Sequence, residues 1–287
     1  MVRIVTDSAS DIESNMLEDW GVTCASLSIM FDNEVLKENV DISRTDFYER
    51  LINSPVFPKT SQVPPYEFEM IFKEAKAAGE EVVAILLSSS LSGTYQSAVS
   101  AARSVYGDSY EEKGCYIIDC CSASAGELLL VEQATLLRKQ GKSAREIADA
   151  MLSLRTDLRL YACVNTLEYL HRGGRISKVV AAIGSIVKVK PVLFVNQKGT
   201  PEMIARIRGE QKAVKYLLEQ LQHEVPDERY PIYLMYSYVD EAAQQLRKHL
   251  RLAGYQIRMK HMIHAGAVIG SHVGPNAFGM VYVRKNQ

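Results

Sequence analysis

Apolar runs that favour extended structure alternate with amphipathic helical segments along most of the chain. The expected strands are, in order, residues 2–6, 82–88, 115–120, 158–164, 191–195 and 231–236. Several of these runs are apolar at successive positions, which is typical of strands whose two faces are both covered by helices. The pattern therefore predicts an α/β chain with mixed sheets.

Capping signals agree with the helical periodicity of three segments. A Ser10-x-x-Glu13 pair predicts the start of a helix over residues 12–20, and Gly21 predicts its end. A second helix is expected over residues 66–78, just before a glycine. The pair Ser143-x-x-Glu146 predicts a third, which runs to about residue 156.

Turn residues predict two hairpins, around Asp32-Asn33 and around residues 196–199. No internal repeat or low-complexity segment marks a linker. Residues 154–157 separate a predicted helix from a predicted strand and divide the chain into halves of similar size. We therefore predict an N-terminal α/β domain over residues 1–157 and a C-terminal α/β domain over residues 158–287.

Composition narrows the classes of function. Lys and Arg total 33 against 34 Asp and Glu, so the net charge is -1 and the basic excess needed for nucleic-acid binding is missing. The longest apolar run, residues 82–87, is far shorter than a membrane span, which argues against stable membrane insertion. The first residues contain no apolar signal core, so we expect a cytoplasmic protein.

The five cysteines are interpreted as reduced thiols. None is spaced Cys-x-x-Cys, and most fall within or beside apolar strand-like runs. Cys120-Cys121 closes one such run and could be reactive, but free cysteines more often act as small core residues.

Small, hydroxyl-rich segments follow three of the predicted strands, over residues 6–11, 88–94 and 119–126. Ligands of open α/β sheets bind beyond the carboxyl ends of the strands, and hydroxyls beside free amides suit an anionic oxygen. These segments predict recognition of a carboxylate or phosphate. A single helix cap is the alternative for each, although residues 88–94 carry five hydroxyls where one cap needs one.

Further candidate ligands occur in four other loops. Residues 59–65 place Thr60 and Ser61 before two prolines, and residues 264–275 form a loop rich in glycine and histidine. Arg172 and Arg175 flank a glycine pair, and residues 206–208 carry two more arginines. Arginine's planar donors fit a phosphate or carboxylate, although solvated surface charge is an equal alternative.

Several common catalytic and metal-binding motifs are missing from the sequence. Residues 141–143 resemble a P-loop ending, but Leu136 occupies the position of the first glycine and a helix precedes the segment. There is no G-x-G-x-x-G, G-x-S-x-G or H-E-x-x-H motif. His261 and His264 have no acidic or cysteine partner in a metal-binding pattern, so no metal is expected.

Eight ordered blocks together resemble the DegV family over nearly the whole chain. They are IVTDSASDI, TSQVPP, SSSLSGTYQSA, IDCCSASAGE, LEYLHRGGRIS, KPVL, RIRGEQKA and VIGSHVGPNAFGM. The resemblance implies two α/β domains with one long-chain fatty acid between them and no other cofactor. It also implies a bacterial, acyl-carrying subunit of fatty acid kinase, whose separate catalytic subunit brings ATP and forms an acyl phosphate.

The resemblance also implies roles for individual residues. The family's carboxylate ligands fall on Ser61 or its neighbour Thr60 and on Ser92, and a histidine near the head group falls on His272. Its phosphotransfer or kinase-contact arginines fall on two further positions, Arg172 and Arg208, with Arg206 as the less favoured alternative to Arg208. The chain departs from the family pattern at Ser90 and at residues 120–121, which puts the local shape of the site in question.

Two other functions compete with that of a non-enzymatic binding subunit. One is a free-standing hydrolase with Ser92 as nucleophile and His272 as base, which the missing G-x-S-x-G motif argues against. The other is a passive lipid carrier without a kinase, and only the arginines argue against it.

Overall fold

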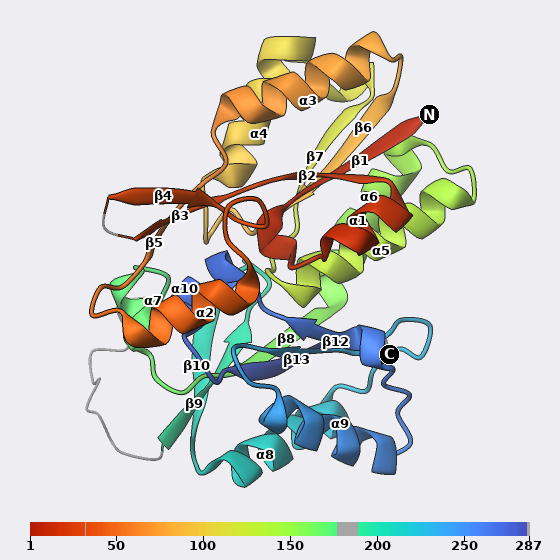
Figure 1. Ribbon diagram of the computed structural model, residues 1–287. Helices are drawn as coiled ribbons and strands as arrows, with labels where there is room; N and C mark the ends of the chain where they lie inside the picture. Colours follow the sequence, from red (N-terminus) through yellow and green to blue (C-terminus); the bar gives the residue numbers. More distant parts are fainter. Residues whose placement is uncertain (32, 177–188, 286–287) are drawn as a thin grey trace.

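A computed structural model describes residues 1–31, 33–176 and 189–285 of the chain. Asp32, in the first predicted hairpin, and Ser177, the last residue of the LEYLHRGGRIS block, lie outside the described residues. The described part contains two large sheets and one small sheet, with helices between and around them (Figure 1).

The first large sheet is parallel and has the strand order β2-β1-β6-β7. Its strands are β1 (Val2–Asp7), β2 (Val22–Ala25), β6 (Glu81–Leu86) and β7 (Cys115–Asp119). One face packs against α3 (Pro65–Ala77) and α4 (Thr94–Tyr106), and the other against α5 (Ala125–Lys139) and α6 (Ala144–Leu154). Helices on both faces explain why the strands are apolar at successive positions.

The second large sheet is mixed and has the order β10-β9-β8-β13-β11-β12. Its strands are β8 (Leu158–Cys163), β9 (Val189–Val195), β10 (Pro201–Arg208), β11 (Tyr233–Tyr236), β12 (Met262–His264) and β13 (Phe278–Val283). On its outer face lie α8 (Glu210–His223) and α9 (Glu241–Leu252). Its inner face is directed toward α5 and the first half of the chain (Figure 1).

The third sheet is a small antiparallel one of order β4-β3-β5. It consists of β3 (Ser28–Phe31), β4 (Glu34–Lys37) and β5 (Lys59–Ser61). The remaining α-helices are α1 (Ser14–Trp20), α2 (Arg44–Asn53), α7 (Glu168–Arg172) and α10 (Ala267–Val273). Four 3-10 turns complete the described structure: η1 (Ser8–Ser10), η2 (Glu111–Lys113), η3 (Arg155–Asp157) and η4 (Met259–His261). Although α10 belongs to the second half of the sequence, it packs against α2, β3 and β5 of the first half.

The strands that the sequence predicts are present, but one predicted helix start is not. Each predicted strand and both hairpins are found, and the Ser143–Glu146 capping box is formed. The predicted cap at Ser10 is wrong, because Ser10 lies in η1 and its hydroxyl donates to the carbonyl oxygen of Asp7 at 2.7 Å. Helix α1 begins at Ser14 instead, and it ends as predicted at Gly21, where φ is +59°.

One apolar core is continuous between the two large sheets. Leu128, Leu129 and Val131 of α5 are completely buried in a cluster that also contains inward-facing residues of both sheets. Helix α5 contacts β1 and β6 on one side and β8, β11 and β13 on the other. The two halves therefore share a core. No helix in the described ranges has both the length and the apolar character needed to cross a membrane.

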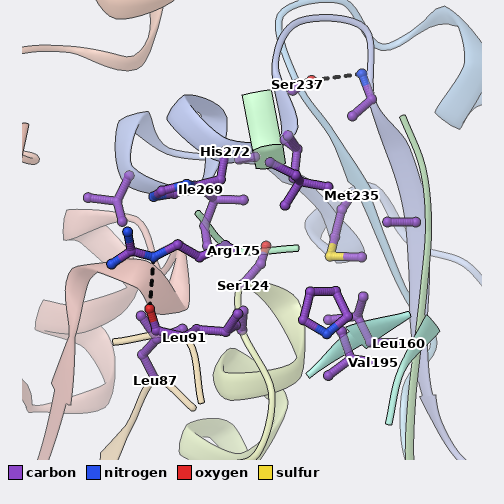
Figure 2. Close-up of a pocket in the computed structure, with 18 of the residues that line it drawn as sticks. Leu87, Leu91, Ser124, Leu160, Arg175, Val195, Met235, Ser237, Ile269 and His272 are labelled. Atoms are coloured by element: carbon purple, nitrogen blue, oxygen red, sulfur yellow. Dashed lines mark hydrogen bonds between the residues drawn. The ribbon is translucent and has the colours of Figure 1, made fainter. Parts of the chain in front are cut away.

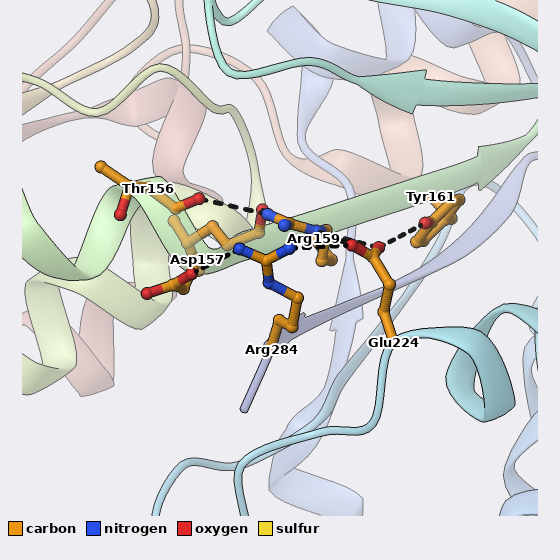
Figure 3. A network of polar contacts seen from close by, with 7 residues as sticks. Thr156, Asp157, Arg159, Tyr161, Glu224 and Arg284 are labelled. Carbon is orange, nitrogen blue, oxygen red and sulfur yellow. Dashed lines mark hydrogen bonds and ion pairs between the residues drawn. The ribbon is translucent and has the colours of Figure 1, made fainter. Parts of the chain in front are cut away.

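Charged side chains join the start of β8 to the C-terminal strand and to the end of α8 (Figure 3). Arg159, whose side chain is only 5% exposed, donates through Nε to both carboxylate oxygens of Glu224 at 2.9 Å. Tyr161 and Arg284 also donate to Glu224, at 3.1 and 3.4 Å. Glu224 thus compensates a buried positive charge, and an unpaired buried charge would be costly.

We expect Glu224→Ala to lower the free energy of unfolding by about 3 kcal/mol, because the positive charge of Arg159 would stay buried without its carboxylate partner. Urea unfolding measures the change. The matched control is Glu168→Ala, which removes an exposed ion pair with Arg172 and should cost no more than about 0.5 kcal/mol. Equal losses in the two variants would contradict this assignment.

Candidate functional site

A cavity lies between the inner face of the six-stranded sheet and the loops of the first half (Figure 2). The volume of this cavity is about 130 Å³. Most of the lining is aliphatic, including Leu87, Leu160, Val195 and Ile269. Water would find few hydrogen-bond partners there, so the cavity suits an apolar ligand.

Small residues at the centre of the six-stranded sheet create this space. Ala162 on β8 and Gly279 on β13 are direct neighbours across the strands, and Gly279 is also paired with Met235 on β11. A side chain on Gly279 would collide with the backbone of Tyr161, so the glycine also permits close strand pairing. The Met235 thioether projects into the cavity beside Leu160 and Val195 (Figure 2).

Besides the aliphatic residues, several polar side chains line the cavity. They are Thr60, Ser61, Gln62, Ser92, Ser124, Arg175, Tyr236, Ser237 and His272. All four residues predicted to bind a carboxylate are in this set: Thr60 and Ser61 come from β5, Ser92 from the loop before α4, and His272 from α10. The fold therefore brings together residues separated by up to 212 positions in the sequence.

A hydrogen bond joins two of these predicted ligands. Thr60 Oγ1 lies 2.8 Å from Nε2 of His272. Burial, assisted by the positive charge of Arg175, lowers the pKa of His272 to about 4, so the imidazole is neutral at pH 7. The other ring nitrogen, Nδ1, is directed at Gly173, where any side chain would collide with the ring. Gly173, the first glycine of the pair in the LEYLHRGGRIS block, therefore makes room for His272.

Ser92 both lines the cavity and acts as a local cap. Its hydroxyl lies 2.9 Å from Oγ1 of Thr94 and accepts the Thr94 backbone N–H at 3.2 Å. The neighbouring hydroxyls bond to the protein itself: Ser88 donates to the Gly199 carbonyl and Ser90 to the Lys198 carbonyl. The abundance of hydroxyls over residues 88–94 thus reflects contacts with the second half as well as the cavity.

The predicted arginines lie outside the cavity lining. Arg172 pairs with Glu168 at 2.8 Å and lies 4.1 Å above the ring of Phe57. Arg208 is exposed at the end of β10. Arg175, to which the sequence analysis assigns no individual role, lines the cavity (Figure 2). Its guanidinium donates to the carbonyls of Leu91 and Gly173 at 3.0 and 2.6 Å. The sequence carries no signal that separates it from Arg172, because both arginines flank the same glycine pair.

Metal and thiol chemistry receive no support from the described residues. Within residues 1–31, 33–176 and 189–285, no three His, Cys, Asp or Glu side chains are arranged to hold a metal ion. Cys120 is fully buried and its thiol donates to the carbonyl of Ser122. Burial raises the pKa of Cys120 well above its usual value, so the group is a thiol at neutral pH.

The chain is similar to one described protein family over nearly its full length. The family model described as "Uncharacterised protein, DegV family" matches residues 1–285. A DegV domain-containing protein of Streptococcus pyogenes serotype M1 is 34% identical over 285 residues, which cover 99% of this chain and 98% of that protein. One from Caldanaerobacter subterraneus is 32% identical, with 99% of each chain covered.

Solved structures with the same fold include proteins described as binding fatty acids. A fatty-acid-binding DegV family protein from Thermus thermophilus has a TM-score of 0.87 and 30% identity. DegV of Bacillus subtilis, described as a fatty acid binding protein, has a TM-score of 0.83 and 29% identity. A stearic acid-binding protein from Eubacterium ventriosum has a TM-score of 0.85 and 28% identity. In all three comparisons 99% of each chain is covered.

The lowered pKa of His272 predicts a pH-dependent contribution to stability. The unfolded chain binds a proton at this residue below about pH 6.5, whereas the folded chain does so only near pH 4. Stability is therefore lost as the pH falls through this interval. We expect His272→Gln, which keeps a hydrogen-bonding group without the titration, to gain on the order of 3 kcal/mol relative to wild type between pH 7 and pH 4.

Chemical unfolding of both proteins at each pH measures this difference. The comparison above pH 7 serves as the control, because the two free energies should there differ by a constant. A difference that stays constant down to pH 4 would show that His272 is not held neutral by the fold.

Proposed function

The chain belongs to the DegV family, and from this membership and the geometry of the cavity we propose that it binds one long-chain fatty acid. The observation that carries the proposal is a mainly aliphatic cavity whose polar lining residues include Thr60, His272 and Ser92. We assign the acyl tail to the aliphatic region over the six-stranded sheet. The carboxylate is assigned to these three residues and Ser61. The fatty-acid-binding relatives of the same fold support this assignment.

Magnitudes indicate that the tail provides most of the affinity. A tail of about 14 methylenes, at about 0.8 kcal/mol each, contributes on the order of 11 kcal/mol. One hydrogen bond to a charged group contributes about 1.5 to 3 kcal/mol. The polar groups would therefore orient the ligand, and the aliphatic lining would hold it.

The polar groups can receive a carboxylate without any change in their own charge. When Nε2–H of neutral His272 donates to Oγ1 of Thr60, the Thr60 hydroxyl is free to donate a hydrogen bond to a carboxylate oxygen. Arg175 supplies a positive charge on the same lining, and we assign it to the carboxylate end. No cofactor is required for this binding.

We further propose that the bound carboxylate is presented to a separate ATP-dependent kinase, which would form the acyl phosphate. Phosphoryl transfer depends mainly on positioning and on neutralising charge, so the presenting subunit needs no nucleophile of its own. The exposed Arg172 and Arg208 remain our candidates for contact with the kinase or the transferred phosphoryl group. A partner that uses ATP would place the protein in the cytoplasm.

The geometry favours binding over hydrolysis. In a serine hydrolase the base must lie within hydrogen-bond reach of the nucleophile. Here Nε2 of His272 is bonded to Thr60, and the Ser92 hydroxyl is bonded to Thr94. Each member of the hypothetical pair is thus engaged with another residue.

We also propose that the two domains meet near residue 157. The strands of the parallel sheet and the small sheet all precede this residue, and the strands of the six-stranded sheet all follow it.

Two substitutions should distinguish the contribution of the ligand's head group to the affinity from that of its tail. Ser92→Ala removes one hydrogen bond to the carboxylate, so affinity should fall by about tenfold at every acyl chain length. Ala162→Leu fills the cavity over the six-stranded sheet, so affinity should fall for long chains and change little for short ones.

Titration of delipidated protein with fatty acids of graded length measures both effects. Mass spectrometry of lipids extracted from wild-type protein should show about one fatty acid per chain. No bound fatty acid and no affinity in the titration would overturn the proposed function.

Replacing Arg172 or Arg208 by alanine should leave fatty-acid affinity near that of wild type, because neither side chain lines the cavity. Formation of acyl phosphate with a cognate kinase should fall by about tenfold or more. A coupled assay with kinase, ATP and fatty acid measures this loss. The control is Arg103→Ala, which removes an exposed arginine at the far end of α4. Full kinase activity in both arginine variants would favour the passive carrier.

A further inference from the structure

Four carboxyl groups are buried together near the end of β1. Asp7, Asp11, Glu38 and Glu127 have at most 1% of their surface exposed. Burial raises the pKa of all four, to about 6 for Asp11 and about 8 for Glu38. Burying a carboxyl group costs free energy, so the contacts that these four groups make require an explanation.

The four carboxyls divide into two pairs by the half of the chain that they contact. Asp7 accepts the backbone N–H groups of Ala9 and Leu87, and Glu127 accepts the Thr6 hydroxyl, all within the first half. Asp11 and Glu38 instead reach the second half.

The carboxyl groups of Asp11 and Glu38 bind the beginning of α10. Oδ1 of Asp11 accepts the Gly266 N–H at 2.8 Å, and Oε1 of Glu38 accepts the Val268 N–H at 2.8 Å. A side chain on Gly266 would collide with both carboxylates, although the φ of this residue, -73°, is open to any amino acid. Glycine is thus needed at position 266 because the two carboxyl groups leave no room for a side chain, and not because of the backbone conformation.

Two further residues of the first half hold the segment just before α10. Arg44 donates to the carbonyl of His264, and Tyr48 donates to the carbonyl of Ala265 at 3.0 Å. The ring of His264 is stacked on Tyr48, with 5.3 Å between the ring centroids. The chain is therefore fixed at four positions, 264, 265, 266 and 268, by side chains from the other half.

This fixed segment leads directly into the cavity. Val268, Ile269 and His272 of α10 line it, and His272 lies four residues, or about one helical turn, after Val268. Ser124, another lining residue, donates its hydroxyl to Asp11. Any movement of the first turn of α10 would therefore move His272 relative to Thr60 on β5.

We propose that Asp11 and Glu38 are positioning residues of the head-group site: they fix the first turn of α10 and so hold His272 against Thr60. The inference rests on the proposed fatty-acid site. A serine or threonine could have capped the helix without burying two carboxyl groups, and the burial of such groups is unfavourable, so the pair is better explained by its role in holding α10 than by a gain in stability.

The test compares Glu38→Met, which removes the acceptor, with Glu38→Gln, which retains an acceptor oxygen. The matched control is Glu127→Met, which removes an equally buried carboxyl of the same group that bonds to Thr6 and not to α10. Gly266→Ala is a second probe, because it keeps both carboxylates but displaces them.

Two measurements are made on each variant. The first is the imidazole NMR signal of His272 in the delipidated protein, assigned by its loss in His272→Gln. The second is the dissociation constant for a long-chain fatty acid. We expect Glu38→Met and Gly266→Ala to shift the His272 signal and to weaken binding by about tenfold. Glu38→Gln should restore both values, and Glu127→Met should leave the His272 signal in place.

An unmoved His272 signal in both Glu38→Met and Gly266→Ala would overturn the inference, and so would an equal shift in Glu127→Met. The NMR measurement needs no ligand. If wild-type protein bound no fatty acid while the His272 signal moved as expected, the positioning role would stand and the proposed function would fail.

Discussion

The inner face of the six-stranded sheet has to be covered, and much of the remaining architecture depends on how this is done. An apolar sheet face is stable only when it packs against another layer. Helix α5 covers part of this face and packs on the parallel sheet as well. Over Ala162 and Gly279 the small residues leave a cavity instead. A bound acyl chain would complete the layer there, so the ligand would act as part of the core.

Local sequence signals identify much of the fold, because many of its elements leave a pattern in a short stretch of sequence. Strands buried on both faces have continuous apolar runs, and a capping box such as Ser143–Glu146 satisfies its own helix end. The same reasoning fails at Ser10, which has the cap pattern but bonds to the Asp7 carbonyl within a 3-10 turn. Asp7 stabilises this 3-10 turn because its carboxyl group accepts the backbone N–H of Ala9 within the turn. The same group accepts the backbone N–H of Leu87, which is far away in the sequence.

The candidate site shows the same division between local and long-range information. Family resemblance supplies Thr60, Ser92 and His272, and all three line the cavity. It does not distinguish Arg172 from Arg175, since both flank the glycine pair. The turn at Gly173 and Gly174 directs one into the cavity lining and leaves the other on the surface beside Glu168. Only the path of the chain through that turn decides between them.

The core shared through α5 also limits how a ligand can be exchanged. Opening the two halves about a hinge would expose Leu128, Leu129 and their neighbours, at about 1.5 to 3 kcal/mol for each large side chain. Exchange must therefore use a smaller, local displacement that leaves α5 in place. The residence time of a ligand would then be set by the free energy of that local opening and not by the strength of tail binding alone.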